Sequence, residues 1–212
     1  MVGVGADLEP STLVQAYRDG IFPWPHLRLP LPWFSPDPRG VLTCEYLHMS
    51  RSLRQRLRRC GWTATLDNAF AAVVSACAEP RGDEGTWITR SMVRAYLRLH
   101  ALGWAHSMEI WEGPALVGGL YGVQIGGCFT GESMFRRVSD ASKVALVELV
   151  HRFTEAGGSF VDVQLATPHL RQLGAREVPR SDFLAMLAEV RDDDVRFPLD
   201  ARAVGRLATD AL

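Results

Sequence analysis

The chain has 212 residues, of which 47% are hydrophobic and 22% are charged, and its formal net charge is −1. This length suits one domain, or one domain with a small addition, and the composition is that of an ordinary globular protein, so a multi-domain assembly and a disordered chain are excluded. No apolar run reaches the ~20 residues of a membrane span, and the first ten residues lack the basic patch and apolar core of a signal peptide. We therefore expect a cytoplasmic protein that does not span a membrane.

The cysteines and the distribution of charge narrow the chemistry further. Cys44, Cys60, Cys77 and Cys128 are too far apart in sequence for the close pairs of zinc or redox sites, so we expect no metal. Residues 1–61 carry eight arginines and five acidic residues, a net charge of +3, whereas the rest of the chain has a net charge of −4. An anionic partner is therefore expected to meet the N-terminal part.

The N-terminal part predicts two helices around a rigid loop. An amphipathic stretch follows Ser11 and stops at Gly20, and Ser50 caps an arginine-rich stretch over residues 51–59. Between them, residues 21–38 alternate prolines with two Trp and two Phe, a composition that favours an extended, ordered loop over a helix or a central strand.

From Trp62 onwards the pattern changes to alternating strands and helices. We expect a strand at 62–66, a helix capped by Asp67, a helix over 91–102, consecutive strands at 105–111, 115–126 and 128–135, a helix over 141–156, a buried strand at 159–166 and a helix over 181–190. This order is that of the GNAT acyltransferase fold. The fold class is therefore α+β, with a small N-terminal α/β domain (1–61) before a GNAT-like domain (62–212).

Two groups of polar residues are candidates for chemistry. Asp162 and Gln164 stand two residues apart on an apolar strand, hence on one face, where they either lie in a cleft or close the end of a sheet as a buried pair. Glu132, with Met134 on the same strand, would suit a site that holds an amine beside an apolar group. The alternative for Glu132 is an edge-strand carboxylate that points into water.

The link at residues 136–141 argues against coenzyme A. An acetyltransferase has [Q/R]-x-x-G-x-[G/A] here, so that backbone N–H groups bind the pyrophosphate. This chain has Ser139 in place of the middle glycine, and Asp140 adds a negative charge where the anion would lie. The arginines of 51–59 could instead bind phosphates, or simply be a solvated helix face, and exposed Trp beside them could stack on an unpaired base or pack in the core.

Several motifs, in order and spacing, closely resemble the leucyl/phenylalanyl-tRNA–protein transferase family. The resemblance covers most of residues 8–185, and its main motifs are AYRDGIFPW (16–24), PWFSPDPRGVL (32–42), GTWIT (85–89), LVGGLYGV (116–123), GESMF (131–135), ASKVAL (141–146) and DVQ (162–164). The chain departs from the family's usual pattern at Arg136, and at Arg171 and Gln172, where the family usually has small residues.

The resemblance implies an enzyme without a cofactor. It would move Leu or Phe, and less well Met, from aminoacyl-tRNA to the α-amine of proteins that begin with Arg or Lys, which marks them for N-degron proteolysis. The alternatives are a GNAT N-acetyltransferase that uses acetyl-CoA, and a non-catalytic binder of basic N-termini.

The resemblance also implies roles for individual residues. Asp162 and Gln164 would be the catalytic pair and Glu132 would neutralise the acceptor's cationic end, although either carboxylate could do the other's work. Further groups would bind the donor: Tyr17, Trp24 and Trp87 at the terminal adenosine, Leu120, Phe129 and Met134 at the leucyl or phenylalanyl side chain, and Arg51, Arg54, Arg58 and Arg59 at the tRNA phosphates.

Overall fold

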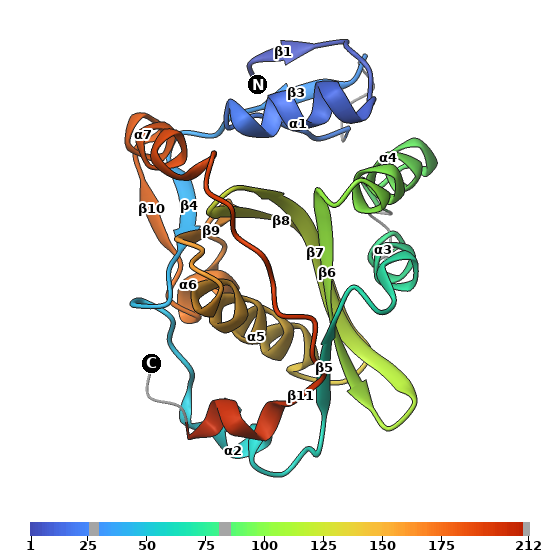
Figure 1. Ribbon diagram of the computed structural model, residues 1–212, viewed down its shortest axis with the longest axis vertical. Coiled ribbons are helices and arrows are strands. Elements are labelled where there is room, and N and C mark those ends of the chain that lie inside the picture. The colour runs from blue at the N-terminus through green and yellow to red at the C-terminus, as the bar shows by residue number, and fades with distance from the viewer. Residues whose placement is uncertain (26–29, 81–85, 210–212) are drawn as a thin grey trace.

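A curled eight-stranded sheet forms the centre of the molecule (Figure 1). The computed structural model describes residues 1–25, 30–80 and 86–209. The strands of this sheet are β4 (Arg39–Leu42), β5 (Thr63–Leu66), β6 (Ala105–Glu112), β7 (Ala115–Ile125), β8 (Cys128–Arg136), β9 (Phe160–Gln164), β10 (Arg176–Val178) and β11 (Arg202–Ala203). Their order in the sheet is β10-β4-β9-β8-β7-β6-β5-β11.

The middle of the sheet is the antiparallel meander that the alternating sequence predicts. β6, β7 and β8 pair along most of their length, and Gly113 and Gly126 turn the chain between them with φ angles of +55°. Glycine adopts this left-handed conformation without the steric cost that a Cβ atom brings. The three strands predicted at 105–111, 115–126 and 128–135 are therefore confirmed.

Helices cover both faces of the meander. α3 (Phe70–Cys77) and α4 (Arg90–Ala101) lie on one face, and α5 (Ala141–Glu155) lies on the other (Figure 1). Each helix buries an apolar side against the sheet, so two separate hydrophobic cores form, one on each face. The order β5-α3-α4-β6-β7-β8-α5-β9 confirms the predicted GNAT order and the α+β class.

β8 and β9 are the only parallel neighbours in this sheet, within the part of the chain that the structure describes. Their pairing runs from Cys128 to Thr130 on β8 and from Phe160 to Asp162 on β9, and it stops before either strand ends. At the same point the β7–β8 register shifts: Gly131 pairs with Gly122 and Ser133 with Tyr121, which leaves Glu132 as the extra residue of a bulge. The two strands can therefore diverge beyond this point.

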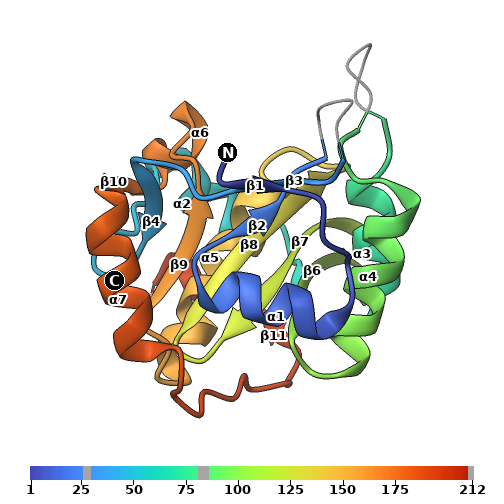
Figure 2. The same ribbon diagram turned by 90° about the horizontal axis from the view of Figure 1, so that it is seen from above.

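The first forty residues form a small unit at the rim of the sheet. β1 (Gly3–Val4), β2 (Phe22–Pro23) and β3 (Pro32–Phe34) make a three-stranded sheet, and α1 (Pro10–Arg18) lies across the top of the large sheet, between α4 and the C-terminal helix α7 (Arg180–Val190) (Figures 1 and 2). Residues 21–38 were predicted as an extended, ordered loop and not as a helix or a central strand; this is wrong for β3, which is the central strand of the small sheet. Prolines are tolerated there because the strands are very short. Residues 26–29 lie outside the described residues.

Residues 39–57 connect this unit to the large sheet. β4 pairs with β9 and β10, so the large sheet includes a strand from before residue 61. α2 (Arg51–Leu57) has the predicted cap, because the Ser50 hydroxyl accepts the Leu53 N–H at 3.2 Å. α2 packs against the 3-10 helix η2 (Val204–Ala208). The division at residue 61 stays a prediction.

Two details of the sequence interpretation need correction. Asp67 does not cap α3: it has a φ of +60°, its carboxylate accepts the Ser107 N–H, and the helix begins only at Phe70. The sequence patterns also gave no sign of α6 (Pro168–Gln172) or of the short edge strands β10 and β11.

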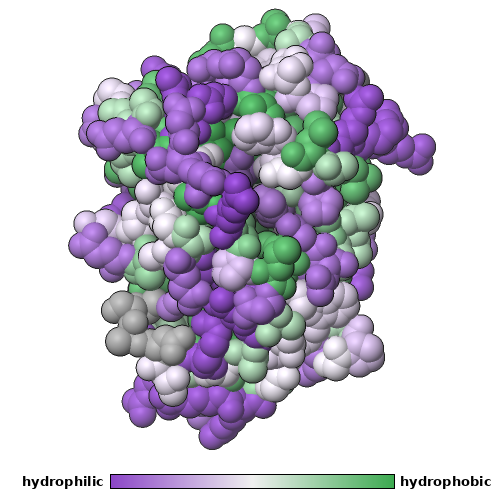
Figure 3. Space-filling model, viewed as in Figure 1, coloured by the Kyte–Doolittle hydropathy of each residue, from purple (hydrophilic) through white to green (hydrophobic). Residues whose placement is uncertain are grey.

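None of the described helices combines the length and apolar character that a membrane crossing needs. On the face seen in Figure 3, hydrophilic and hydrophobic residues are interspersed.

Candidate active site

An apolar cavity of about 340 Å³ lies at the edges of the diverging strands β8 and β9. Its apolar walls come from three strands and from α5, which covers this side of the sheet. They include Leu120, Met134, Leu146, Leu149 and Val161. The polar residues that line it from the strands are Glu132, Ser133 and Gln164. Such a cavity suits an apolar side chain with one reactive polar end.

Glu132 is held by residues from three distant segments. The Tyr17 hydroxyl donates to Oε1 at 2.7 Å, the Tyr96 hydroxyl donates to Oε2 at 2.6 Å, and Gln164 Nε2 donates to Oε1 at 3.1 Å. The carboxylate is 9% exposed, so the alternative of an edge-strand Glu pointing into water is wrong. The bulge at this position explains the inward placement, because an extra residue redirects the side chain.

The two tyrosine hydroxyls supply two protons for three close contacts around Glu132. The two tyrosine oxygens also lie 2.8 Å apart, so Tyr17, Tyr96 and Glu132 form a ring of three contacts. When both hydroxyls donate to the carboxylate, no proton is left between the tyrosines, whereas a proton on Glu132 completes the ring. Burial raises the pKa of Glu132 to about 7, although the tyrosine hydrogen bonds act in the opposite direction.

Asp162 is enclosed and fully bonded. It is 0% exposed, and Arg39 donates to both of its oxygens, from Nε at 2.8 Å and from a terminal nitrogen at 2.6 Å. Thr130 and the backbone N–H of Gln164 complete its partners. Gln164 has a φ of +62°, which ends the regular strand alternation, so its side chain reaches Glu132 while Asp162 fixes its backbone.

Arg39 joins the N-terminal unit to this site. Its guanidinium lies 5.0 Å from the ring centre of Phe22 and 4.4 Å from that of Phe183, and it donates to the carbonyl oxygen of Gly20 at 3.1 Å. The same group therefore contacts the N-terminal unit, β9 and α7. A buried arginine with a bidentate carboxylate partner is a strongly oriented ion pair.

The aromatic residues predicted to meet the donor are placed differently. Tyr17 is buried and uses its hydroxyl on Glu132, so it is not available to stack on a base. Phe129 is fully buried against Phe153 and Phe197 in the core and is not among the residues that line the cavity. Trp24 and Trp87 are half-buried and pack against the hydrophobic cluster formed by α1, α3 and α4. Leu120 and Met134 line the apolar cavity, and their contact with the donor's side chain stays a prediction.

The arginines of α2 and its C-terminal end lie on the surface. Arg51, Arg58 and Arg59 are exposed and Arg54 is half-buried, while Leu53 and Leu57 anchor the helix. Arg56 lies 3.9 Å from Asp140, at the start of α5. The helix therefore adjoins the turn at residues 136–141, where Asp140 has a φ of +69° and pairs with Lys143 at 2.8 Å.

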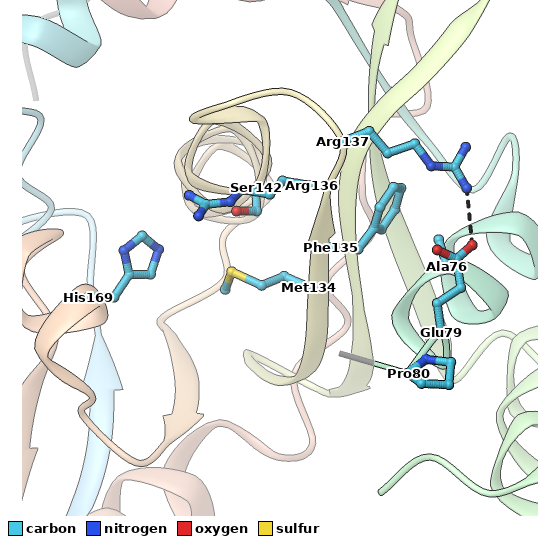
Figure 4. Close-up of a pocket in the computed structure, with 9 residues that line it drawn as sticks. All are labelled: Ala76, Glu79, Pro80, Met134, Phe135, Arg136, Arg137, Ser142 and His169. Carbon is cyan, nitrogen blue, oxygen red and sulfur yellow. Dashed lines mark hydrogen bonds and ion pairs between the residues drawn. The ribbon is translucent and has the colours of Figure 1, made fainter. Parts of the chain in front are cut away.

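A second cavity adjoins the first. It measures about 620 Å³ and lies between the end of α3, the end of β8 and α6, with Met134 and His169 lining both cavities (Figure 4). Three residues at these sites were not found from the sequence: Arg39, Tyr96 and His169. The arginine that opens the apolar segment RGVL was the one available signal, because a buried arginine requires an anionic partner.

The element order is that of the GNAT-like acyltransferase fold, and this chain places a buried acid and a half-buried amide beside an apolar cavity. The family described as leucyl/phenylalanyl-tRNA protein transferase matches residues 41–188, and that family's N-terminal domain matches residues 6–37. The chain belongs to this family.

Individual relatives agree with this assignment. A leucyl/phenylalanyl-tRNA–protein transferase from Anaeromyxobacter sp. is 54% identical over 190 residues, 89% of this chain and 82% of the relative. One from Shewanella pealeana is 47% identical over 196 residues, 92% of this chain and 83% of the relative. Among solved structures, a GCN5-related N-acetyltransferase from Kribbella flavida has a TM-score of 0.43 at 12% identity, over 74% of this chain and 56% of that one.

Proposed function

We propose that this enzyme transfers leucine or phenylalanine, and less efficiently methionine, from aminoacyl-tRNA to the α-amine of proteins that begin with Arg or Lys. The transfer would take place in the cytoplasm and would mark the acceptor for N-degron proteolysis. Glu132, bonded to two tyrosines and Gln164 at the edge of an apolar cavity, is the observation that carries the proposal. The names of the relatives support the donor.

The apolar cavity would hold the donor's side chain. Its volume of about 340 Å³ and its walls of Leu120, Met134 and Leu146 suit a leucyl or phenylalanyl group. A flexible methionine wall adapts to either shape. The ester carbonyl would then lie at the polar edge of the cavity, beside Glu132 and Gln164.

The acceptor amine would approach from the same polar edge. Gln164 donates its amide nitrogen to Glu132, so its Oε1 is directed elsewhere and could accept a hydrogen bond from the amine. Attack forms a bond between the amine nitrogen and the carbonyl carbon, and the bond to the 3′-oxygen of the adenosine breaks. The ester is already activated, so orientation supplies much of the rate enhancement.

Glu132 would accept the amine proton, and Asp162 would act as a positioning residue. A carboxyl group with a pKa of about 7 is partly ionised at neutral pH, which suits a group that accepts a proton and returns it to the leaving oxygen. Asp162 already accepts from Arg39, Thr130 and Gln164, so it has little remaining capacity for a proton. This proposal differs from the sequence interpretation, which gave the catalytic role to Asp162 and the neutralisation of the acceptor's charge to Glu132.

The surface arginines would bind the tRNA. Arg51, Arg54, Arg58 and Arg59 lie on or just beyond one short helix, where guanidinium groups could contact successive phosphates. Such contacts depend strongly on salt and little on sequence.

The test combines purified protein, tRNA charged with labelled leucine, and a peptide that begins with Arg. We expect label in the peptide, no label after ribonuclease treatment, and no label in a peptide whose α-amine is acetylated. Glu132→Gln should lower turnover by roughly 10²–10⁴-fold, the usual contribution of a proton acceptor. Glu189→Gln, an exposed change on α7, is the matched control.

Two results would contradict the proposal. Full turnover in Glu132→Gln would remove this residue from proton transfer. Acetylation of the same peptide from acetyl-CoA, with no transfer from charged tRNA, would instead favour an N-acetyltransferase. The turn at residues 136–141 argues against that outcome, because Asp140 stands at the start of α5, where the diphosphate would bind.

A further inference from the structure

Two arginine side chains line the larger cavity, and of these Arg137 alone has a partner among the described residues. Arg136 and Arg137 both come from the end of β8, yet their side chains leave in opposite directions (Figure 4). Arg137 reaches Glu79 at 3.2 Å, which neutralises its charge locally. Arg136 extends over Ser142 towards the side where His169 lies, and it forms no ion pair or hydrogen bond with any described residue.

Other basic side chains lie near Arg136. His169 faces the cavity from α6, and its pKa is lowered by burial and then by the nearby charges of Lys143 and Arg136. The nearby carboxylates are already paired: Glu79 lies 3.2 Å from Arg137, and Asp140 lies 2.8 Å from Lys143 and 3.9 Å from Arg56. An anion beside Arg136 would relieve the repulsion among these groups.

The larger cavity is continuous with the smaller one, which the proposed function assigns to the donor's side chain. Met134 and His169 line both cavities, so a ligand whose apolar end occupies the smaller cavity can continue directly into the larger one. An aminoacyl-tRNA has this sequence of chemistry: an apolar side chain, an ester, a nucleoside and then a phosphodiester. The arginines of α2 adjoin the same turn through Arg56 and Asp140, which gives the RNA a basic surface on which to continue.

We infer that Arg136, together with His169, binds the phosphate on the 5′ side of the terminal adenosine of the donor. The inference rests on the proposed function, which it extends to one specific group of the substrate. A guanidinium can bind a phosphate through two parallel hydrogen bonds, and the neutral imidazole can add a third donor.

The test compares two hydrolysis-resistant donor analogues by calorimetry. Both contain phenylalanine linked through an amide to the 3′ position of adenosine, and one also has a 5′-phosphate. In the wild-type protein we expect the phosphate to lower the Kd at least tenfold, as hydrogen bonds between charged partners commonly do. In Arg136→Gln we expect this ratio of the two Kd values to fall to about threefold or less.

Arg171→Gln is the matched control. It removes one positive charge from α6, two residues beyond His169, but Arg171 pairs with Glu177 at 2.7 Å and does not line the cavity. The control should keep the tenfold ratio. An equal decrease of the Kd ratio in both variants would show a general charge effect and would overturn the assignment. An unchanged Kd ratio in Arg136→Gln would also overturn it.

The same titrations separate the two possible failures. Binding of the unphosphorylated analogue with no gain from the phosphate would overturn the Arg136 contact and leave the proposed function intact. No binding of either analogue would overturn the proposed function and the inference with it. Coenzyme A is the final arm: binding that depends on Arg136 would assign the phosphate site to a different donor.

Discussion

The buried pair of Arg39 and Asp162 makes the strongest prediction of stability. The two side chains are 1% and 0% exposed, so replacing Arg39 with methionine leaves a carboxylate without its counter-charge inside the protein. Breaking a buried ion pair by removing one partner costs ~3–5 kcal/mol. Arg39 also packs between two phenylalanine rings, and methionine retains part of that contact. We therefore expect the free energy of unfolding to fall by about 3 kcal/mol.

The measurement is urea unfolding at pH 7, with Arg98→Met as the control. Arg98 pairs with Glu9 at 2.8 Å, but these side chains are 59% and 56% exposed, and exposed pairs contribute ~0–1 kcal/mol. Asp162→Asn and the double variant complete a double-mutant cycle. The free energy of unfolding should fall much less in the double variant than the sum of its decreases in the two single variants. A loss below about 1 kcal/mol in Arg39→Met would refute the reasoning.

Two further predictions concern Glu132 and Gly174. The pKa of Glu132 rises from 4.5 to about 7 on folding, so the protein is stabilised below pH 4.5 and loses this stability as pH rises through 7. One pKa unit corresponds to roughly 1.4 kcal/mol. The free energy of unfolding of the wild type, measured with urea, should therefore fall by about 3 kcal/mol between pH 4.5 and 8 relative to that of Glu132→Gln. Parallel pH profiles of the two proteins would contradict this. Gly174 has a φ of +101°, and a Cβ there would lie 1.7 Å from the carbonyl oxygen of Tyr46. Gly157 has a φ of +91°, but nothing lies within 4 Å of where its Cβ would stand. Gly174→Ala should therefore lower the free energy of unfolding several times more than Gly157→Ala does. Similar unfolding midpoints for the two variants would show that the clash is absent.

Regular periodicity predicted the central elements well, because β6, β7, β8 and α5 are long enough to show it. Short edge elements such as β10 carry too few residues for any pattern, so their existence depends on pairing that only the folded sheet reveals. Asp67 shows a different failure: it has the composition of a cap, but Ser107 and His106 take its carboxylate, so tertiary contacts decide its conformation.

The candidate site could be predicted in residue type more easily than in arrangement. Glu132, Gln164, Leu120 and Met134 were found from motifs, and all four meet at one cavity. The buried position of Tyr17 was not predicted, because its contact with Glu132 joins residues 115 positions apart. Arg39 was missed for the same reason: a local pattern does not report a partner on a distant strand.

The ring around Glu132 draws on α1, α4 and β8, with Gln164 added from β9. A chain that has not yet docked its first helix would have the same glutamate with one fewer hydroxyl group beside it. The complete set of hydrogen bonds around this carboxyl group therefore forms only when all four segments are in place, so a chain truncated before Arg18 or after Phe160 would lack part of it.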